Sequence, residues 1–201
     1  IGFTPAGRGP WGGPTPPARR VTIASCNATC AVRAAHPSTS TTTLARRPRI
    51  ASISRCTSPD FQTWTDPVEM DFGGTPREHL YTNQTSPYFR APQIYISTAA
   101  RFMPGRRVIS EDEATQIGVV KSYAGDCSDG VLMTSRGGMR YDRTFMEGFV
   151  RPGIGPENWT SRTNYPARGV IQTGPNEISL FVQHNYGQPT HHLERYAIRL
   201  D

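Results

Sequence analysis

The chain has 201 residues, a formal net charge of +6, 19 glycines, 18 prolines and only 36% hydrophobic residues. So many residues that interrupt regular backbone exclude a protein built from long helices and favour short strands joined by turns. No apolar run approaches the roughly 18 residues of a membrane-spanning helix, so no membrane partner is expected.

The positive charge is concentrated at the beginning of the chain. Residues 1–59 contain eight arginines and no acid, whereas the remainder holds 14 basic and 16 acidic residues. A nucleic-acid-binding domain needs its basic residues clustered on the fold itself. No nucleic-acid partner is therefore expected.

The composition divides the chain into two parts. Residues 1–45 are rich in Pro, Gly, Ser and Thr, a composition that buries too little apolar surface to offset chain entropy. We expect this segment to be a disordered leader, or a spurious or frame-shifted translation, and residues 46–201 to form the folded part. The four cysteines lack the spacing of a zinc site, and no metal or cofactor is expected.

Short strands are predicted along the folded part. Apolar or alternating runs bounded by turn residues place them at residues 50–55, 93–98, 130–135, 169–173, 178–184 and 193–200. One helical turn is predicted at residues 110–116, where Ser110 precedes three acidic residues. The sequence therefore predicts an all-β fold: a sandwich, a barrel or a propeller.

A turn pattern occurs twice and favours the propeller. Ser58 and Ser135 are each followed by a tight turn and, six positions later, by an aromatic residue, Trp64 or Tyr141. The Ser58 hydroxyl and the Asp60 carboxylate suit hydrogen bonding to the N–H groups of the first turn. The two copies lie 77 residues apart, which exceeds the ~40–50 residues of a typical blade and predicts an inserted loop around residues 105–116.

The motifs around these turns resemble bacterial glycoside-hydrolase-like proteins of the five-bladed β-propeller type, distant relatives of the β-fructosidase and arabinanase/xylosidase families. One departure is Gly137, which stands where these proteins usually have Asp. The resemblance covers residues 46–201, through motifs at residues 49–67, 79–83, 87–88, 101–102, 129–136, 143, 151–153, 159, 162–165, 177–181, 186, 189–190 and 193–201.

The resemblance implies a partial ring. Residues 46–201 supply about three blades at ~40–50 residues each, whereas a closed ring needs at least four. The chain is then a C-terminal fragment that needs missing N-terminal blades to close the ring. Exposed strand edges and limited stability are expected of such a fragment.

Glycoside hydrolysis generally uses two carboxyl groups, which the resemblance implies would lie near the propeller axis. Asp129 and Glu177 each precede an apolar strand and are the catalytic candidates. Either residue could instead begin a strand or pair with a nearby arginine.

A carbohydrate is the expected ligand. Sugar sites combine flat apolar rings with planar hydrogen-bonding groups, as loops rich in aromatic residues and arginine can do. Whether the protein is a hydrolase, a non-catalytic propeller that binds carbohydrate or protein, or a truncated product without activity of its own stays open, as does its compartment. The substrate-binding candidates are His79, Tyr81, Arg136, Arg151, Trp159, Arg162, Asn164 and Tyr165.

Overall fold

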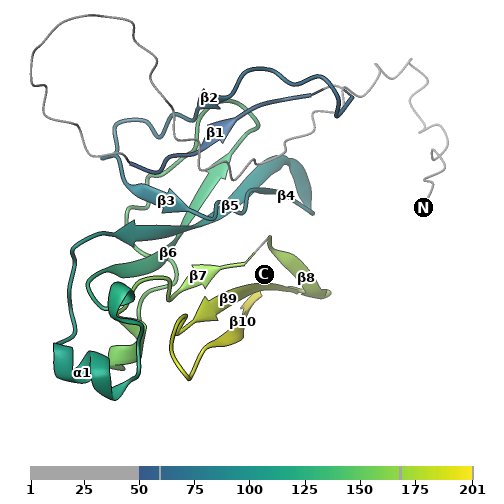
Figure 1. Ribbon diagram of the computed structural model, residues 1–201. Helices are drawn as coiled ribbons and strands as arrows, with labels where there is room; N and C mark the ends of the chain where they lie inside the picture. The colour runs from purple at the N-terminus through teal and green to yellow at the C-terminus, as the bar shows by residue number, and fades with distance from the viewer. Residues whose placement is uncertain (1–49, 59, 168, 201) are drawn as a thin grey trace, which may run out of the picture.

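The computed structural model describes residues 50–58, 60–167 and 169–200 (Figure 1), so the predicted leader at residues 1–45 lies outside the described residues. The described chain is mostly antiparallel β-sheet, which confirms the all-β prediction. In chain order its elements are β1 (Ser54–Arg55), β2 (Val68–Glu69), β3 (His79–Tyr81), β4 (Ser86–Tyr88), β5 (Ala91–Met103), α1 (Glu111–Gln116), η1 (Lys121–Tyr123), β6 (Cys127–Ser135), η2 (Pro156–Asn158), β7 (Tyr165–Pro166), β8 (Ile171–Gly174), β9 (Glu177–His184) and β10 (His192–Arg199).

The first of the two four-stranded sheets along the chain is organised around the long strand β5. On one edge, β3 pairs with the C-terminal half of β5 and β4 pairs with its N-terminal half. On the other edge, β6 pairs with β5 over nine residues. We call this four-stranded unit the β5 sheet; the hairpin of β1 and β2 forms a separate small sheet.

The second four-stranded sheet, the β9 sheet, repeats this plan. The short strand β7 pairs with the C-terminal half of β9, and β8 pairs with its N-terminal half. The strand β10 pairs with β9 along its full length on the other edge. In both sheets, two short strands therefore come first in the chain, then a long central strand, then a strand that pairs with most or all of the central strand. Figure 1 shows the β9 sheet beside the β5 sheet.

The predicted insertion and its helical turn are present between β5 and β6. Ser110 caps α1 by accepting a hydrogen bond from the backbone N–H of Glu113, and the Glu113 side chain accepts one from the backbone N–H of Ser110. This reciprocal pair is the capping box. The segment places α1 and η1 beside the loop that carries η2.

The main core lies between the β5 sheet and the β1–β2 hairpin. Its buried residues come from distant parts of the chain and include Val131 and Met133, which are 0% and 1% exposed. Of the strand predicted at residues 50–55, only β1 pairs in a regular ladder. The carbonyl oxygens of residues 51 and 53 accept hydrogen bonds from the N–H groups of Leu80 and Met70, outside a regular ladder. The strands β2, β3, β4 and β7 were not predicted, since each has only two or three residues.

The first repeated turn has the predicted hydrogen bonds. The Ser58 hydroxyl accepts from the Phe61 N–H at 2.7 Å, and the Asp60 carboxylate accepts from the N–H groups of Gln62 and Thr63 at 2.8 Å each. The bonds from Thr63 and Gln62 hold the pKa of Asp60 below its ordinary value of 3.8. The carboxylate therefore stays ionised and organises the turn.

The aromatic residues of the two turns have different environments. Trp64 is 37% exposed and packs edge-on against Phe61 in its own turn. Tyr141 is 4% exposed, and its hydroxyl contacts Thr85 at 2.5 Å and accepts from Asn83 at 3.0 Å. Gly137 in the second turn adopts a φ of +82°, a conformation that favours glycine.

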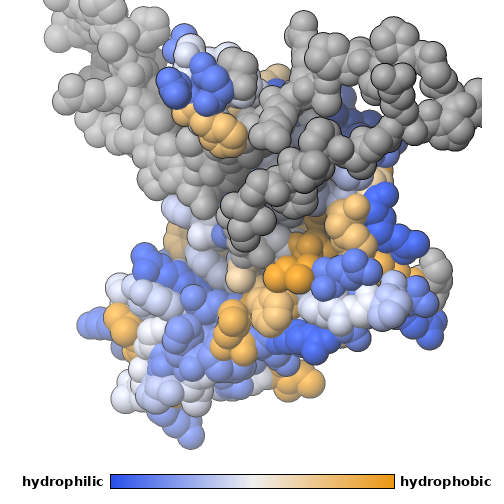
Figure 2. Space-filling model, turned by 90° about the vertical axis from the view of Figure 1, so that its right-hand side faces the viewer, coloured by the Kyte–Doolittle hydropathy of each residue, from blue (hydrophilic) through white to orange (hydrophobic). Residues whose placement is uncertain are grey.

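The β9 sheet leaves large hydrophobic side chains exposed. Ile171 on β8 is 48% exposed and Leu193 on β10 is 61% exposed. Figure 2 shows hydrophobic residues lying among hydrophilic ones on one side of the molecule. Among the residues that the structure describes, nothing pairs with the outer edge of β10.

Candidate functional site

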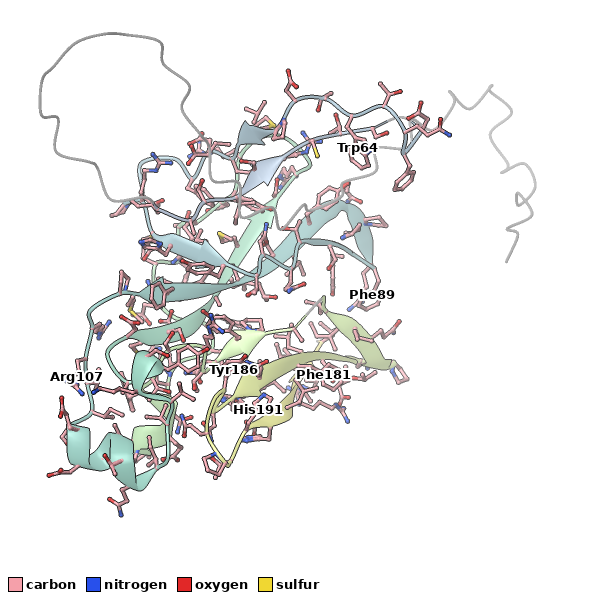
Figure 3. All side chains as sticks on the ribbon, in the orientation of Figure 1. Trp64, Phe89, Arg107, Phe181, Tyr186 and His191 are labelled. Atoms are coloured by element: carbon pink, nitrogen blue, oxygen red, sulfur yellow. The ribbon has the colours of Figure 1, made fainter. Side chains whose placement is uncertain are left out.

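A pocket of about 460 Å³ lies where the β5 sheet meets the β9 sheet. Strand ends and loops from both sheets form its walls, together with the segment between β5 and β6. Figure 3 labels Tyr186, which follows β9 and belongs to this wall. The lining residues of this pocket, which we call the tyrosine pocket, are Tyr81, Thr82, Phe102, Ser122, Tyr123, Asp126, Ser161, Arg162, Tyr165, Gln183 and Tyr186.

Aromatic rings form two groups in this pocket. Tyr81 and Phe102, on paired strands of the β5 sheet, pack edge to face with ring centroids 5.5 Å apart. Tyr123 and Tyr186 have centroids 5.6 Å apart. The guanidinium of Arg162 lies 4.8 Å from the Tyr123 centroid and 5.4 Å from that of Tyr186, within the range of cation–π attraction.

The backbone is strained around the tyrosine pocket. Four of the five non-glycine residues with positive φ in the described part of the chain line the pocket or precede a residue that does: Thr82 (+46°), Arg162 (+63°), Asn164 (+64°) and Asn185 (+54°). Such conformations cost of order 1–3 kcal/mol each and cluster at functional sites. A β-branched residue such as threonine adopts them least readily.

Tyr165 supplies a hydroxyl that stays protonated. Burial raises its pKa to about 12; the nearby Arg162 opposes this shift, and Tyr81 and Asp126 add to it. A phenol with this pKa remains neutral in any physiological solution and can donate a hydrogen bond to a ligand.

The catalytic candidate Asp129 lies outside this pocket, in a buried charge cluster. Its two carboxylate oxygens accept hydrogen bonds from Arg101, at 2.9 and 2.6 Å. Arg101 also donates to Glu78 at 2.9 Å, and Glu78 accepts from Arg143 at 2.9 Å. Asp129 is 5% exposed and Arg143 is 2% exposed. Arginines thus bind both carboxylates of this cluster, which agrees with the alternative prediction that Asp129 pairs with a nearby arginine.

The catalytic candidate Glu177 begins β9, on the other sheet. It forms an ion pair with Arg195 on β10 and accepts a hydrogen bond from Thr173 at 2.6 Å. The structure therefore places Asp129 and Glu177 on different sheets, each in its own ion pair, and neither lines the tyrosine pocket.

Three of the substrate-binding candidates meet in the tyrosine pocket: Tyr81, Arg162 and Tyr165. Asn164 lies directly beside it but is 0% exposed, and its side-chain amide donates to the carbonyl oxygens of Ser128 and Asn158. Asn164 therefore fixes the loop before β7.

The other substrate-binding candidates lie outside the tyrosine pocket. His79 packs beside Tyr81 and Phe102, and its Nδ1 accepts from the Ala51 N–H. Trp159 packs against the cluster around α1 and donates to the Gly153 carbonyl. Arg151 pairs with Glu147 at the surface, and Arg136 belongs to the exposed turn after β6.

Eight lining residues of the tyrosine pocket were absent from the predicted site, among them Phe102, Tyr123, Asp126 and Tyr186. One sequence signal could have found two of the pocket tyrosines. The pair Asn-Tyr occurs at residues 164–165 and 185–186, and in both pairs the asparagine has positive φ and the tyrosine lines the pocket. Among residues other than glycine, asparagine is one of those that tolerate this conformation best.

A second cavity of about 180 Å³ lies beside the buried charge cluster and includes Glu78 and Arg143 in its wall. Within residues 50–58, 60–167 and 169–200, no three His, Cys, Asp or Glu side chains gather closely enough to hold a metal ion. The same residues contain no helix with the length and apolar character needed to cross a membrane.

Comparison with protein-family models, with curated proteins and with solved structures found no match to this chain. The resemblance to glycoside-hydrolase-like propellers therefore rests on the sequence motifs alone.

Proposed function

We propose that this protein binds a carbohydrate in the tyrosine pocket. The observation that carries the proposal is the lining itself, in which four tyrosines surround hydroxyl, amide, carboxylate and guanidinium groups. A sugar ring has an apolar face that packs on aromatic side chains, and an edge of hydroxyls that needs donors and acceptors. A mostly apolar cleft with a few converging polar groups is the common form of a small-ligand site.

Binding without hydrolysis is the form of this function that the lining favours. Hydrolysis of a glycosidic bond generally needs two carboxyl groups on either side of that bond. Asp126 is the one carboxylate among the described lining residues. A hydrolase remains the second candidate, on the strength of the sequence motifs, and it would need a further carboxylate near the pocket.

The hydrolase can be tested separately through its two predicted catalytic residues. Glu177→Gln and Asp129→Asn, made in a form that contains any preceding blades, would be assayed on a panel of glycosides. Hydrolysis by both variants at the wild-type rate would show that neither residue is catalytic. Binding of glycans by the wild type without any cleavage would exclude the enzyme.

We further propose that the two four-stranded sheets are successive blades of a propeller. The two sheets share a plan of two short strands, a long central strand and a partner that covers most or all of it, and this supports the arrangement because blades are copies of one unit. The exposed hydrophobic residues of the β9 sheet are consistent with a face that a further blade would cover.

The propeller proposal predicts how the 201-residue chain behaves by itself. With the edge of β10 unpaired and a sheet face uncovered, we expect it to unfold over a broad temperature range or to associate with other copies. Calorimetry combined with light scattering measures both properties. A sharp, cooperative transition of a monomer would contradict the proposal.

A variant of Tyr186 tests the carbohydrate site directly. We expect Tyr186→Ala to weaken oligosaccharide binding at least tenfold, because it removes a ring from the wall and one of the two rings that hold Arg162. Titration calorimetry against a panel of oligosaccharides measures the affinity.

The matched control for this test is Tyr88→Ala. Tyr88 ends β4, packs against the adjacent Phe89 and does not line the tyrosine pocket, so this variant should bind like the wild type. The proposal fails if no saccharide binds the wild type, or if the two variants bind equally well and as tightly as the wild type.

A further inference from the structure

Arg162 is set apart from the other described arginines by its contact with two aromatic rings, since several others also form no ion pair within the described residues. The ion pairs found in the described residues involve Arg77, Arg101, Arg107, Arg143, Arg151 and Arg195, each with a carboxylate. Arg162 takes part in none of these pairs. Its guanidinium instead lies against the rings of Tyr123 and Tyr186 and lines the tyrosine pocket.

The loop that carries Arg162 is otherwise buried and firmly hydrogen-bonded. Thr160, Ser161, Thr163 and Asn164 are between 0% and 4% exposed, whereas Arg162 is exposed. The Ser161 N–H donates to the Tyr123 carbonyl at 2.9 Å. Further bonds tie the loop down: Ser128 donates to the Thr163 carbonyl at 2.8 Å, Gln188 donates to the Thr160 hydroxyl at 3.0 Å, and Asn164 donates to the Ser128 carbonyl at 3.1 Å.

The buried, hydrogen-bonded loop orients the Arg162 guanidinium before any ligand binds. The φ of +63° at Arg162 is unfavourable for a residue with a side chain, and the surrounding bonds hold it in place. The two rings then restrict the side chain further. Orienting an arginine in advance lowers the entropy lost when it binds, and its planar fork matches the two oxygens of a carboxylate.

Asp126 limits which anion can enter. Its Oδ1 accepts from the Gly105 N–H at 2.8 Å, and the residue lines the same pocket as Arg162. The Asp126 carboxylate would repel an anion that has no hydroxyl groups to donate hydrogen bonds to it. A ligand that also carries hydroxyl groups can donate hydrogen bonds to Asp126 and accept one from Tyr165, so the two charges select for an anion with hydroxyls.

We infer that the tyrosine pocket is selective for an acidic sugar, with the carboxylate of a uronic acid on Arg162 and its hydroxyl groups on Asp126 and Tyr165. The inference rests on the proposed carbohydrate-binding function and specifies the class of sugar.

The test compares acidic and neutral sugars that share the same ring hydroxyls. Oligosaccharides of galacturonic acid, their methyl esters and the corresponding neutral galactose oligosaccharides would be titrated calorimetrically against the 201-residue chain; glucuronic acid and glucose oligosaccharides would form a second series. We expect the wild type to bind an acidic oligosaccharide at least tenfold more tightly than its ester or its neutral counterpart. Added salt should reduce this preference.

Variants assign the preference to one side chain. Arg162→Gln should abolish the tenfold preference, so that acidic, esterified and neutral oligosaccharides bind this variant with affinities within about threefold of one another. Arg162→Lys should retain part of the preference, since it keeps the charge and loses the fork. The control Arg151→Gln removes an exposed arginine outside the pocket and should bind like the wild type.

The outcomes separate this inference from the proposed function. Equal binding of acidic, esterified and neutral sugars by the wild type would overturn the inference and leave carbohydrate binding standing. A preference for acidic sugars that persists in Arg162→Gln would also overturn it. Failure of every sugar to bind the wild type would overturn both. The comparison of acid with ester uses only the wild type, so it holds even where a variant folds poorly.

Discussion

Replacing Asp129 by asparagine is expected to lower the free energy of unfolding by about 3 kcal/mol, because it breaks a buried ion pair and leaves a charge behind. Asp129 accepts both of its hydrogen bonds from Arg101, and its side chain is 8% exposed. In the variant, Glu78 alone would face two arginines, Arg101 and Arg143. Urea unfolding followed by circular dichroism measures the change.

The control for Asp129→Asn is Glu147→Gln, which breaks the pair with Arg151. The two side chains of this pair are 63% and 66% exposed, and exposed pairs contribute less than about 1 kcal/mol. An Asp129→Asn variant as stable as the wild type would contradict the structural role of the carboxylate. It would then strengthen the assignment of Asp129 as a catalytic residue.

Replacing Gly130 by valine is expected to cost about 3 kcal/mol of stability, because it forces apart the two sheets that form the tyrosine pocket. A Cβ atom added at Gly130 would lie 3.0 Å from Pro166 on β7, 3.1 Å from Val150 and 3.3 Å from the carbonyl oxygen of Asn164. These neighbours include the β9 sheet and the loop that carries Arg162. The variant should therefore lose affinity for sugars as well as stability, and unfolding and calorimetric titration measure the two effects.

The matched control for Gly130→Val is Gly125→Ala. A Cβ atom at Gly125 meets nothing within 4 Å and the residue lacks a positive φ, so its replacement should change stability by less than about 0.5 kcal/mol. Full stability and unchanged sugar affinity in Gly130→Val would show that the two sheets do not pack at this glycine as described.

The buried charge cluster shows why the role of Asp129 could not be predicted from the sequence. Asp129 lies just before an apolar run, and a carboxylate there suits either catalysis or pairing. Its partner Arg101 is 28 residues away and meets it only because β5 and β6 pair in a register that sets the two residues opposite each other. Pairing register depends on the packing of whole strands, which the local pattern does not contain.

Features that depend only on neighbouring residues could be predicted from the sequence. The long strands follow from runs of apolar and β-branched residues, the capping box from Ser110 and Glu113, and the first turn from Ser58 and Asp60. Each of these features depends on hydrogen bonds or on a side-chain pattern that spans only a few residues. Local composition was therefore sufficient to predict them.

The set of residues that meet in the tyrosine pocket depends instead on tertiary contacts. Its walls come from β3, β5, β7, β9 and four connecting segments, and Tyr81 and Tyr186 lie 105 residues apart in the chain. The strands β3 and β7 have three and two residues and acquire their pairing from the long strands β5 and β9. Strands this short contain too few residues for a recognisable pattern of apolar and polar side chains. Contacts between the sheets bring Arg162, Tyr165 and Asp126 together, and these contacts cannot be predicted from the local sequence.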